Sequence, residues 1–251
     1  MWTPSINYRN PFIVEAVLDI QTSASPAGGE FALGDFLSRH DDYPERDDFT
    51  SQVVSLTAGD SVSANVDSEE KGFSFRSASG KRLVRVLPDR LIFSEFSPYT
   101  GWDAFASEGL RLWRRFMSRQ NPLGVKRVGV RYINRIEIDA AEAPVRMEDY
   151  FHTYPAMSYD ISAPMNKFFM STQYNFPKEQ AAATVTQAST EATRPNALGI
   201  LLDIDVWRDQ ETGLDSSNIS LDTRQIIEEL RAVKNSLFEA CITNQLRELM
   251  Q

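Results

Sequence analysis

Three arginines recur at every fourth residue within Val125 to Ile138, VKRVGVRYINRIEI. Side chains of a strand alternate between two faces, so Arg127, Arg131 and Arg135 share one face. Neighbours in this row stand roughly 13 Å apart at about 3.3 Å per residue. Guanidinium groups bind phosphate through paired hydrogen bonds. We therefore predict an anion-binding site at this row, joined by Arg85 from an earlier strand.

Carboxylates also share strand faces. Glu15 and Asp19 lie on one face of the first predicted strand, Asp203 and Asp205 lie on one face of a late strand, and Glu137 follows the arginine row. If these faces converge, the carboxylates would hold a divalent cation and suit a metal-dependent phosphohydrolase. The structural alternative is a ladder of cross-strand ion pairs, each contributing roughly 0.2–1 kcal/mol. No metal is expected unless these carboxylates meet.

Aromatic side chains interleave with the basic segment, as they do where proteins stack single-stranded nucleic acid on rings. Most of these aromatics fall on faces assigned to the core. Tyr99 and Trp102, between a predicted strand and a predicted helix, are expected at the surface. The acidic remainder of the chain opposes non-specific binding of nucleic acid.

Motifs for covalent and metal catalysis are absent from the sequence. There is no G-x-S-x-G elbow, CxxC unit, P-loop or GxGxxG turn, and the two histidines, His40 and His152, lie in loop-like settings. Cys241 falls on the apolar stripe of a helix, where a small buried side chain is expected. We predict no catalytic residue and no cofactor, and a non-enzymatic protein is favoured.

Composition is that of an ordinary globular protein, with 251 residues, 42% hydrophobic and 24% charged. No apolar run approaches the roughly 18 residues that span a bilayer, and the first residues lack the blocks of a secretory signal. A single cysteine suits a reducing compartment. We expect a cytoplasmic protein with no membrane partner.

The net charge of −9 is unevenly distributed. Residues 1–70 hold 3 basic and 13 acidic residues, residues 71–135 hold 14 and 4, and residues 136–251 hold 9 and 18. The basic middle third would either form an anion-binding surface or pair with the acidic flanks inside one fold.

Periodicity predicts the elements that position these residues. Strands are predicted at 12–21, 52–56, 73–77, 82–87, 91–96, 125–138, 168–175, 182–188 and 198–207. Helices are predicted at 30–39, 102–120, 147–151 and 221–250, with the acidic run 41–48 as a solvated loop and 57–71 as a polar connection.

Two segments, 73–120 and 168–250, repeat the order β-β-β-α. This predicts a pseudo-duplicated α+β fold, in which helices pack on a largely antiparallel sheet and the C-terminal helix is long. An N-terminal half (1–139) and a C-terminal half (140–251) are expected to form one compact unit.

Three stretches, NPFIVEAVLDIQ, RVGVRYINRIEI and LRAVKNSLFEACITNQLRELM, resemble a sporadically distributed family of uncharacterised prokaryotic proteins of about this length. The runs Arg131–Ile136 and Phe238–Thr243 are the most specific parts of the resemblance, which covers nearly the whole chain. It supplies no catalytic residues. Its patchy occurrence implies an accessory gene, such as those of phage defence or toxin–antitoxin systems.

The function expected from the sequence is therefore that of a binding or partner protein, with another protein or a second copy as its partner. The alternative is a phosphate-, nucleotide- or nucleic-acid-binding protein that uses the arginine row. A metal-dependent phosphohydrolase is the third possibility.

Overall fold

The computed structural model describes residues 8–23, 31–37, 42–58, 62–141, 144–156, 165–209 and 219–251. Its strands are β1 (Ile13–Thr22), β2 (Glu45–Ala58), β3 (Val62–Arg76), β4 (Arg82–Leu87), β5 (Arg90–Phe96), β6 (Val125–Asp139), β7 (Phe169–Phe176), β8 (Ala181–Thr190) and β9 (Ala197–Asp209). Its helices are α1 (Phe31–Gly34), α2 (Trp102–Gln120), α3 (Met147–Tyr150), α4 (Ile219–Cys241) and α5 (Asn244–Glu248).

The nine strands form one sheet in the order β2-β3-β4-β5-β1-β6-β9-β8-β7, and all neighbouring strands run antiparallel. The α+β class and the antiparallel sheet are thus as predicted. The strands β1 and β6 lie at the centre, and β6 pairs with β9. The sheet therefore contains strands from both predicted halves of the chain.

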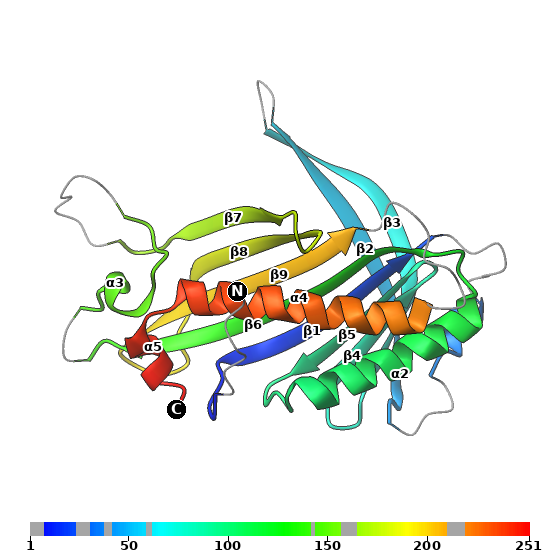
Figure 1. Ribbon diagram of the computed structural model, residues 1–251, viewed down its shortest axis with the longest axis horizontal. Coiled ribbons are helices and arrows are strands. Elements are labelled where there is room, and N and C mark those ends of the chain that lie inside the picture. The colour runs from blue at the N-terminus through cyan, green and yellow to red at the C-terminus, as the bar shows by residue number, and fades with distance from the viewer. Residues whose placement is uncertain are drawn as a thin grey trace.

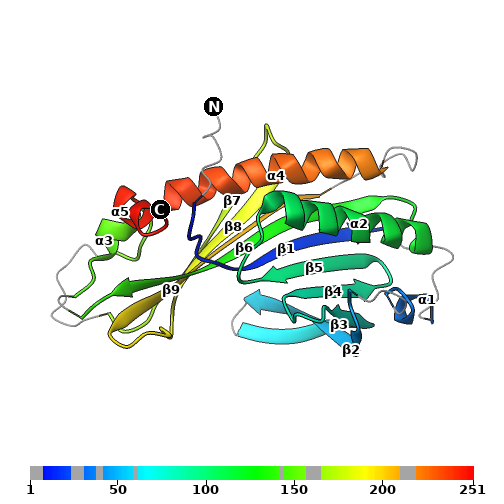
Figure 2. The ribbon, with the colours of Figure 1, turned by 90° about the horizontal axis from the view of Figure 1, so that it is seen from below.

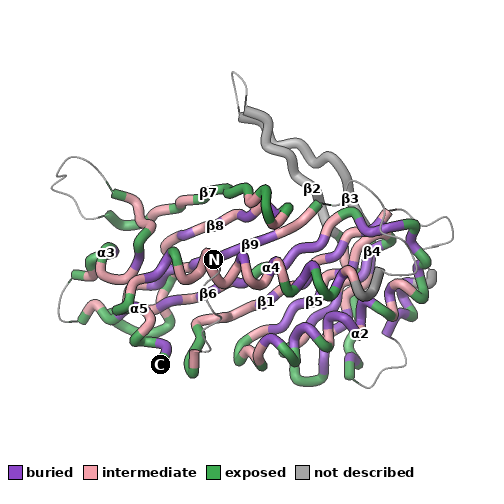
Figure 3. The backbone as a smooth tube through the Cα atoms, in the orientation of Figure 1, coloured by how far each residue is buried: buried purple, intermediate pink, exposed green. Residues whose placement is uncertain are grey.

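The two long helices, α2 and α4, lie on the same side of the sheet (Figures 1 and 2). Alternation in the strands explains this layering, because Leu18 of β1 and Val130 of β6 are buried on the helix-covered face. Helix α2 packs closely there: a Cβ on Gly109 would stand 2.7 Å from a methyl group of Leu18. The core thus lies between the central strands and these two helices (Figure 3).

The edge opposite β2 is less well covered. Strand β7 has no buried residue, and Phe169 is 75% exposed. Figure 3 shows this strand in green and pink, whereas the strands at the centre of the sheet are largely purple. Burial therefore decreases from the centre of the sheet toward β7.

Three predicted element boundaries are wrong. Residues 45–48, assigned to an acidic loop, belong to β2, and most of the predicted polar connection 57–71 belongs to β2 and β3. Strand pairing uses backbone groups, so polar side chains do not prevent it. The short N-terminal helix occupies only Phe31–Gly34, and residues 38–41 lie outside the described ranges.

The predicted helix 221–250 is interrupted. Helix α4 ends at Cys241, Ile242 forms a bridge with Phe151, and Thr243 caps α5 by accepting a hydrogen bond from the Leu246 N–H. The apolar stripe continues through the break, since Ile242 and Leu246 are both buried. Periodicity alone therefore conceals it.

Within the described residues, none of the helices combines the length and apolar composition needed to cross a bilayer.

Candidate functional site

The predicted arginine row lies on the sheet face away from α2 and α4. In β6, Val128 and Val130 are buried on the helix-covered face, so the alternate positions Arg127, Arg131 and Arg135 lie on the other face. The structure thus places the row on one face, as the alternation predicts.

The first two arginines of the row contact side chains of β9. The Arg131 Nε donates to Asp203 at 2.9 Å, and its side chain keeps 47% of its surface exposed. The Arg127 guanidinium lies 4.7 Å from the centre of the Trp207 ring and 3.9 Å from an oxygen of Asp205. Much of the row's positive charge is therefore matched by β9.

Arg135 lies beside Glu137, with 3.6 Å between Nε and Oε1, and donates a hydrogen bond to the carbonyl of Glu191. Glu137 also accepts hydrogen bonds from the N–H and hydroxyl of Thr193, at 2.6 and 2.7 Å, and from Arg194. The Thr193 N–H is the largest cause that lowers the pKa of Glu137 to about 2. This carboxylate is held ionised.

The remaining predicted site residues on this face lie beside opposite charges or rings. The Arg85 guanidinium lies 5.3 Å from the centre of the Phe49 ring; burial lowers its pKa, and the charge of Glu15 opposes that shift. Asp19 forms an ion pair with Arg90. In the described ranges, no three His, Cys, Asp or Glu residues are grouped so that they could hold a metal ion.

The expectation that Tyr99 and Trp102 lie at the surface is wrong for Trp102, which is 7% exposed, while Tyr99 is partly buried. The Trp102 Nε1 donates to Glu228 of α4 at 2.8 Å. Docking of α4 therefore covers residues that local sequence places in an open loop.

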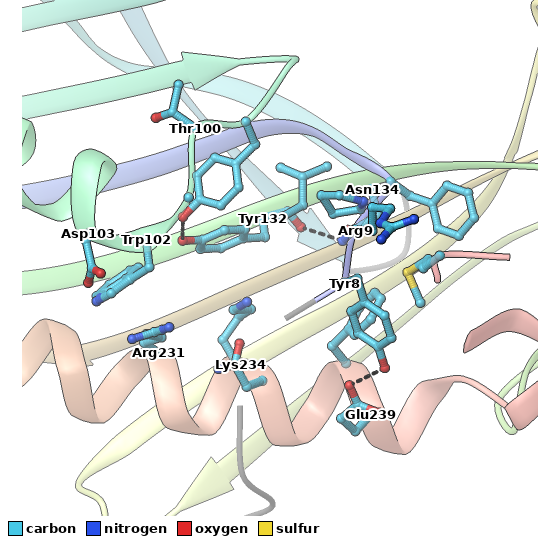
Figure 4. A pocket seen from close by; sticks show the side chains of 18 of the residues that line it. Tyr8, Arg9, Thr100, Trp102, Asp103, Tyr132, Asn134, Arg231, Lys234 and Glu239 are labelled. Atoms are coloured by element: carbon cyan, nitrogen blue, oxygen red, sulfur yellow. Dashed lines mark hydrogen bonds between the residues drawn. The ribbon is translucent and has the colours of Figure 1, made fainter. Parts of the chain in front are cut away.

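Both aromatics line a cavity of about 560 Å³ on the helix-covered side of the sheet. Its walls are residues 8, 9 and 11–13, the segment 99–104, β6 and α4, with Met250 also contributing. We call this cavity the α4 pocket; Figure 4 shows its side chains. It joins parts of the chain that are distant in sequence.

Aromatic rings form much of the pocket wall. Tyr132 is buried, and its hydroxyl lies 2.9 Å from that of Tyr99. Burial raises the pKa of Tyr99 to about 12 and that of Tyr132 well above its ordinary value. Both phenols are therefore protonated at neutral pH.

Positive side chains of α4 lie against these rings. The Lys234 Nζ is 3.9 Å from the centre of the Tyr132 ring, and the Arg231 guanidinium is 4.7 Å from the centre of the Trp102 ring. Burial, followed by the charge of Arg231, lowers the pKa of Lys234 from 10.5 to about 7. Among the described residues, no hydrogen-bond or ion-pair partner contacts the Lys234 ammonium.

The carboxylate of Glu239, which also lines the pocket, is engaged elsewhere. Glu239 accepts a hydrogen bond from Tyr8 at 2.7 Å and pairs with Arg247 at 2.8 Å. Asn134, buried in the floor, donates to the Leu202 carbonyl at 3.1 Å. The pocket therefore combines aromatic walls with an ammonium that has a ring contact but, among the described residues, no ion pair; the charge of Glu239 only partly opposes the lowering of its pKa.

Two sequence signals for this pocket were missed. Asn134 is a polar residue on the otherwise apolar face of the central strand. Lys234 lies four residues after Leu230 and four before Phe238, so it shares their face of α4. A charged residue on a buried helical face is a candidate for function.

Comparison with known proteins adds no assignment: no protein-family model matches the chain, and no curated protein shows significant similarity to it.

Proposed function

We propose that the protein is a binding protein that holds a small organic anion in the α4 pocket. The observation that carries this proposal is Lys234, an ammonium that lies over the Tyr132 ring and forms no ion pair within the part of the chain that the structure describes. Removing a charge from water is costly unless an opposite charge compensates it. A bound anion would supply that charge.

The size and lining of the pocket support a ligand with a flat ring. About 560 Å³ falls within the usual range of small-molecule sites. Tyr132, Tyr99 and Trp102 make part of the lining aromatic, although Lys234 and Arg231 already cover one face of Tyr132 and of Trp102. Arg9 adds positive charge to that of Lys234, as does Arg231, which also pairs with Glu228 at 3.5 Å. Aromatic carboxylates and mononucleotides share the required chemistry, a flat ring with an anionic group.

The test is a thermal-shift screen, followed by calorimetry, with benzoate, adenosine monophosphate and inorganic phosphate at two salt concentrations. A ligand at 100 times its dissociation constant stabilises by about 2.7 kcal/mol, which gives a measurable rise in melting temperature. We expect a ring-bearing anion to bind the wild type and to bind Lys234→Met at least about tenfold more weakly.

The matched control is Lys167→Met, which removes an exposed lysine and should leave binding unchanged. Benzoate alone as a ligand would point to carboxylates, and adenosine monophosphate alone to nucleotides. A protein that no anion stabilises, or that binds equally well without Lys234, would overturn the proposal.

The alternative is phosphate or nucleotide binding by the arginine row, and the 47% exposure of the Arg131 side chain favours it. The triple variant Arg127→Gln, Arg131→Gln, Arg135→Gln distinguishes the two sites. A shift that survives Lys234→Met but disappears in this variant would move the site to the sheet face. We propose no metal-dependent hydrolysis, since the predicted carboxylates lie beside arginines.

We also infer that the two β-β-β-α segments arose by duplication. In the first segment, β3, β4 and β5 follow one another from near one edge of the sheet toward the central strand β1. In the second segment, β7, β8 and β9 follow one another from the opposite edge toward β6. A long helix follows each set, α2 after β5 and α4 after β9. Superposition of the two segments should align these elements in the same order.

We propose that this binding protein acts in the cytoplasm as an accessory component, such as a sensor in a defence or toxin–antitoxin-like system. The resemblance of the chain to a sporadically distributed prokaryotic family supports this setting, and the single cysteine supports a reducing compartment. In this setting, the protein would bind another protein or a second copy of itself. A strict monomer in light scattering, with no co-purifying protein, would count against it.

A further inference from the structure

Lys234 differs from every other lysine of the chain. The sequence contains six lysines, all within the described ranges, and only Lys234 is partly buried. The five exposed lysines are Lys71, Lys81, Lys126, Lys167 and Lys178. A reaction of lysine amines that requires the α4 pocket should therefore modify Lys234 and not the five exposed lysines.

An amine is a nucleophile only when it is neutral. Lysines become reactive when they are desolvated or lie near another cation, because both effects disfavour the protonated form. Lys234 has both features: it lies against the Tyr132 ring, and Arg231 is one helical turn away. A pKa lowered to about 7 leaves far more of this amine neutral at pH 7 than an exposed lysine has.

We propose that Lys234 forms an imine with the carbonyl carbon of an anionic aldehyde or ketone bound in the α4 pocket. This inference rests on the proposed function, and it narrows the ligand class to anions that carry a carbonyl group.

The step balances without an oxidant or a reductant. The Lys234 Nζ lone pair attacks the carbonyl carbon and forms a C–N bond, and a proton moves from nitrogen to oxygen to give a carbinolamine. The C–O bond then breaks, and the oxygen leaves as water with both amine hydrogens. A C=N bond remains, and proton uptake converts the imine into a cationic iminium.

The walls of the pocket suit each part of this product. The face of Tyr132, which contacts the ammonium, would stabilise the iminium by the same cation–π attraction. Arg9 would hold the anionic group of the ligand together with Arg231, whose guanidinium also pairs with Glu228. The phenols of Tyr132 and Tyr99 remain protonated and are available as hydrogen-bond donors.

The experiment is reductive trapping in the full chain. The protein is incubated at pH 7 with 4-formylbenzoate and cyanoborohydride, and peptide mass spectrometry follows the modification of all six lysines with time. We expect Lys234 to be modified at least about tenfold faster than each exposed lysine, since ordinary lysines are almost wholly protonated at this pH. Excess benzoate should slow the modification at Lys234 only.

Lys234→Arg is the matched variant, because it keeps a positive charge and loses the amine nucleophile. It should abolish the fast modification and leave the five exposed lysines unchanged. If this variant does not fold, the comparison of six lysines within the wild type still decides the question.

Failure of this inference differs from failure of the proposed function. Modification of Lys234 no faster than that of the exposed lysines, in a protein that benzoate still stabilises, would overturn the imine and leave anion binding intact. Slow modification of Lys234 in a protein that neither benzoate nor adenosine monophosphate stabilises would overturn both proposals.

Discussion

The ionisation of Lys234 couples the α4 pocket to protein stability. Its pKa of about 7 in the folded protein lies below the ordinary 10.5. Between these values the unfolded chain binds more protons at this group, so the contribution of Lys234 to the free energy of unfolding rises with pH. Its destabilising effect is complete below about pH 7 and vanishes above about pH 10.5.

Lys234→Met should therefore raise the melting temperature, by at least about 3 °C at pH 7. The difference from the wild type should shrink toward zero as the pH approaches 10.5. Thermal unfolding from pH 6 to 10 measures this, with Lys167→Met as the exposed control. A difference that does not depend on pH would mean that the Lys234 pKa is not depressed.

Two arginines of β6, Arg127 and Arg131, form ion pairs with carboxylates of the neighbouring strand. Arg131 lies opposite Asp205 in the register of β6 and β9 but donates to Asp203, its diagonal neighbour. Diagonal cross-strand pairs are within reach of long side chains. Substitution of a single arginine should therefore affect its ion pair and leave the pocket on the other face intact.

Among the elements, the β3–β4 pair depends on a close backbone approach at Gly72. A Cβ at this position would stand 2.2 Å from the Val86 carbonyl oxygen. The carbonyl belongs to a paired strand, so it cannot move without disturbing hydrogen bonds of the sheet.

Gly72→Ala should consequently reduce the free energy of unfolding by at least about 2 kcal/mol, measured by urea denaturation. Gly80→Ala is the comparison. Gly80 adopts φ +70° with open space around its Cβ position, so only the backbone cost of roughly 1–2 kcal/mol applies. A smaller loss at Gly72 than at Gly80 would contradict the steric argument.

For the whole molecule, the basic middle third of the chain is matched by both acidic flanks. Arg90 pairs with Asp19 from the N-terminal segment, whereas Arg131 pairs with Asp203 from the C-terminal segment. Strands β1, β5, β6 and β9 lie side by side in the sheet, which brings these segments together. The uneven charge of the sequence thus becomes local pairing on one face.

Stability should also vary across the sheet. Strand β7 pairs with β8 on one side, contains no buried residue and lies at an edge, whereas β6 lies at the centre. Segments with little burial open at a lower free energy than the core. In native-state hydrogen exchange, we expect the slowest amides of β7 to exchange at least about 100-fold faster than those of β6, a ratio that corresponds to about 2.7 kcal/mol in opening free energy. Equal protection of β7 and β6 would contradict this and would indicate that another chain pairs with the exposed edge.

The pattern of apolar and polar residues was sufficient to predict the kind of most elements and the buried face of the central strands. Alternation placed Val130 and Tyr132 in the core and Arg131 outside it, because side-chain direction in a strand depends only on local backbone geometry. The fold class follows from the order of these elements. The break between α4 and α5 does not, because it depends on the pairing of Ile242 with Phe151.

Which charged side chains form ion pairs depends, in contrast, on the packing of distant segments. Arg131 meets Asp203 through strand pairing, and Lys234 meets Tyr132 through the docking of α4. Neither contact is local, and the pKa of an amine depends on its burial and neighbouring charges rather than on its residue type. The arginines selected from the sequence are therefore largely neutralised on the sheet, whereas Lys234, which was not selected, lies in the pocket with no ion pair to any described residue.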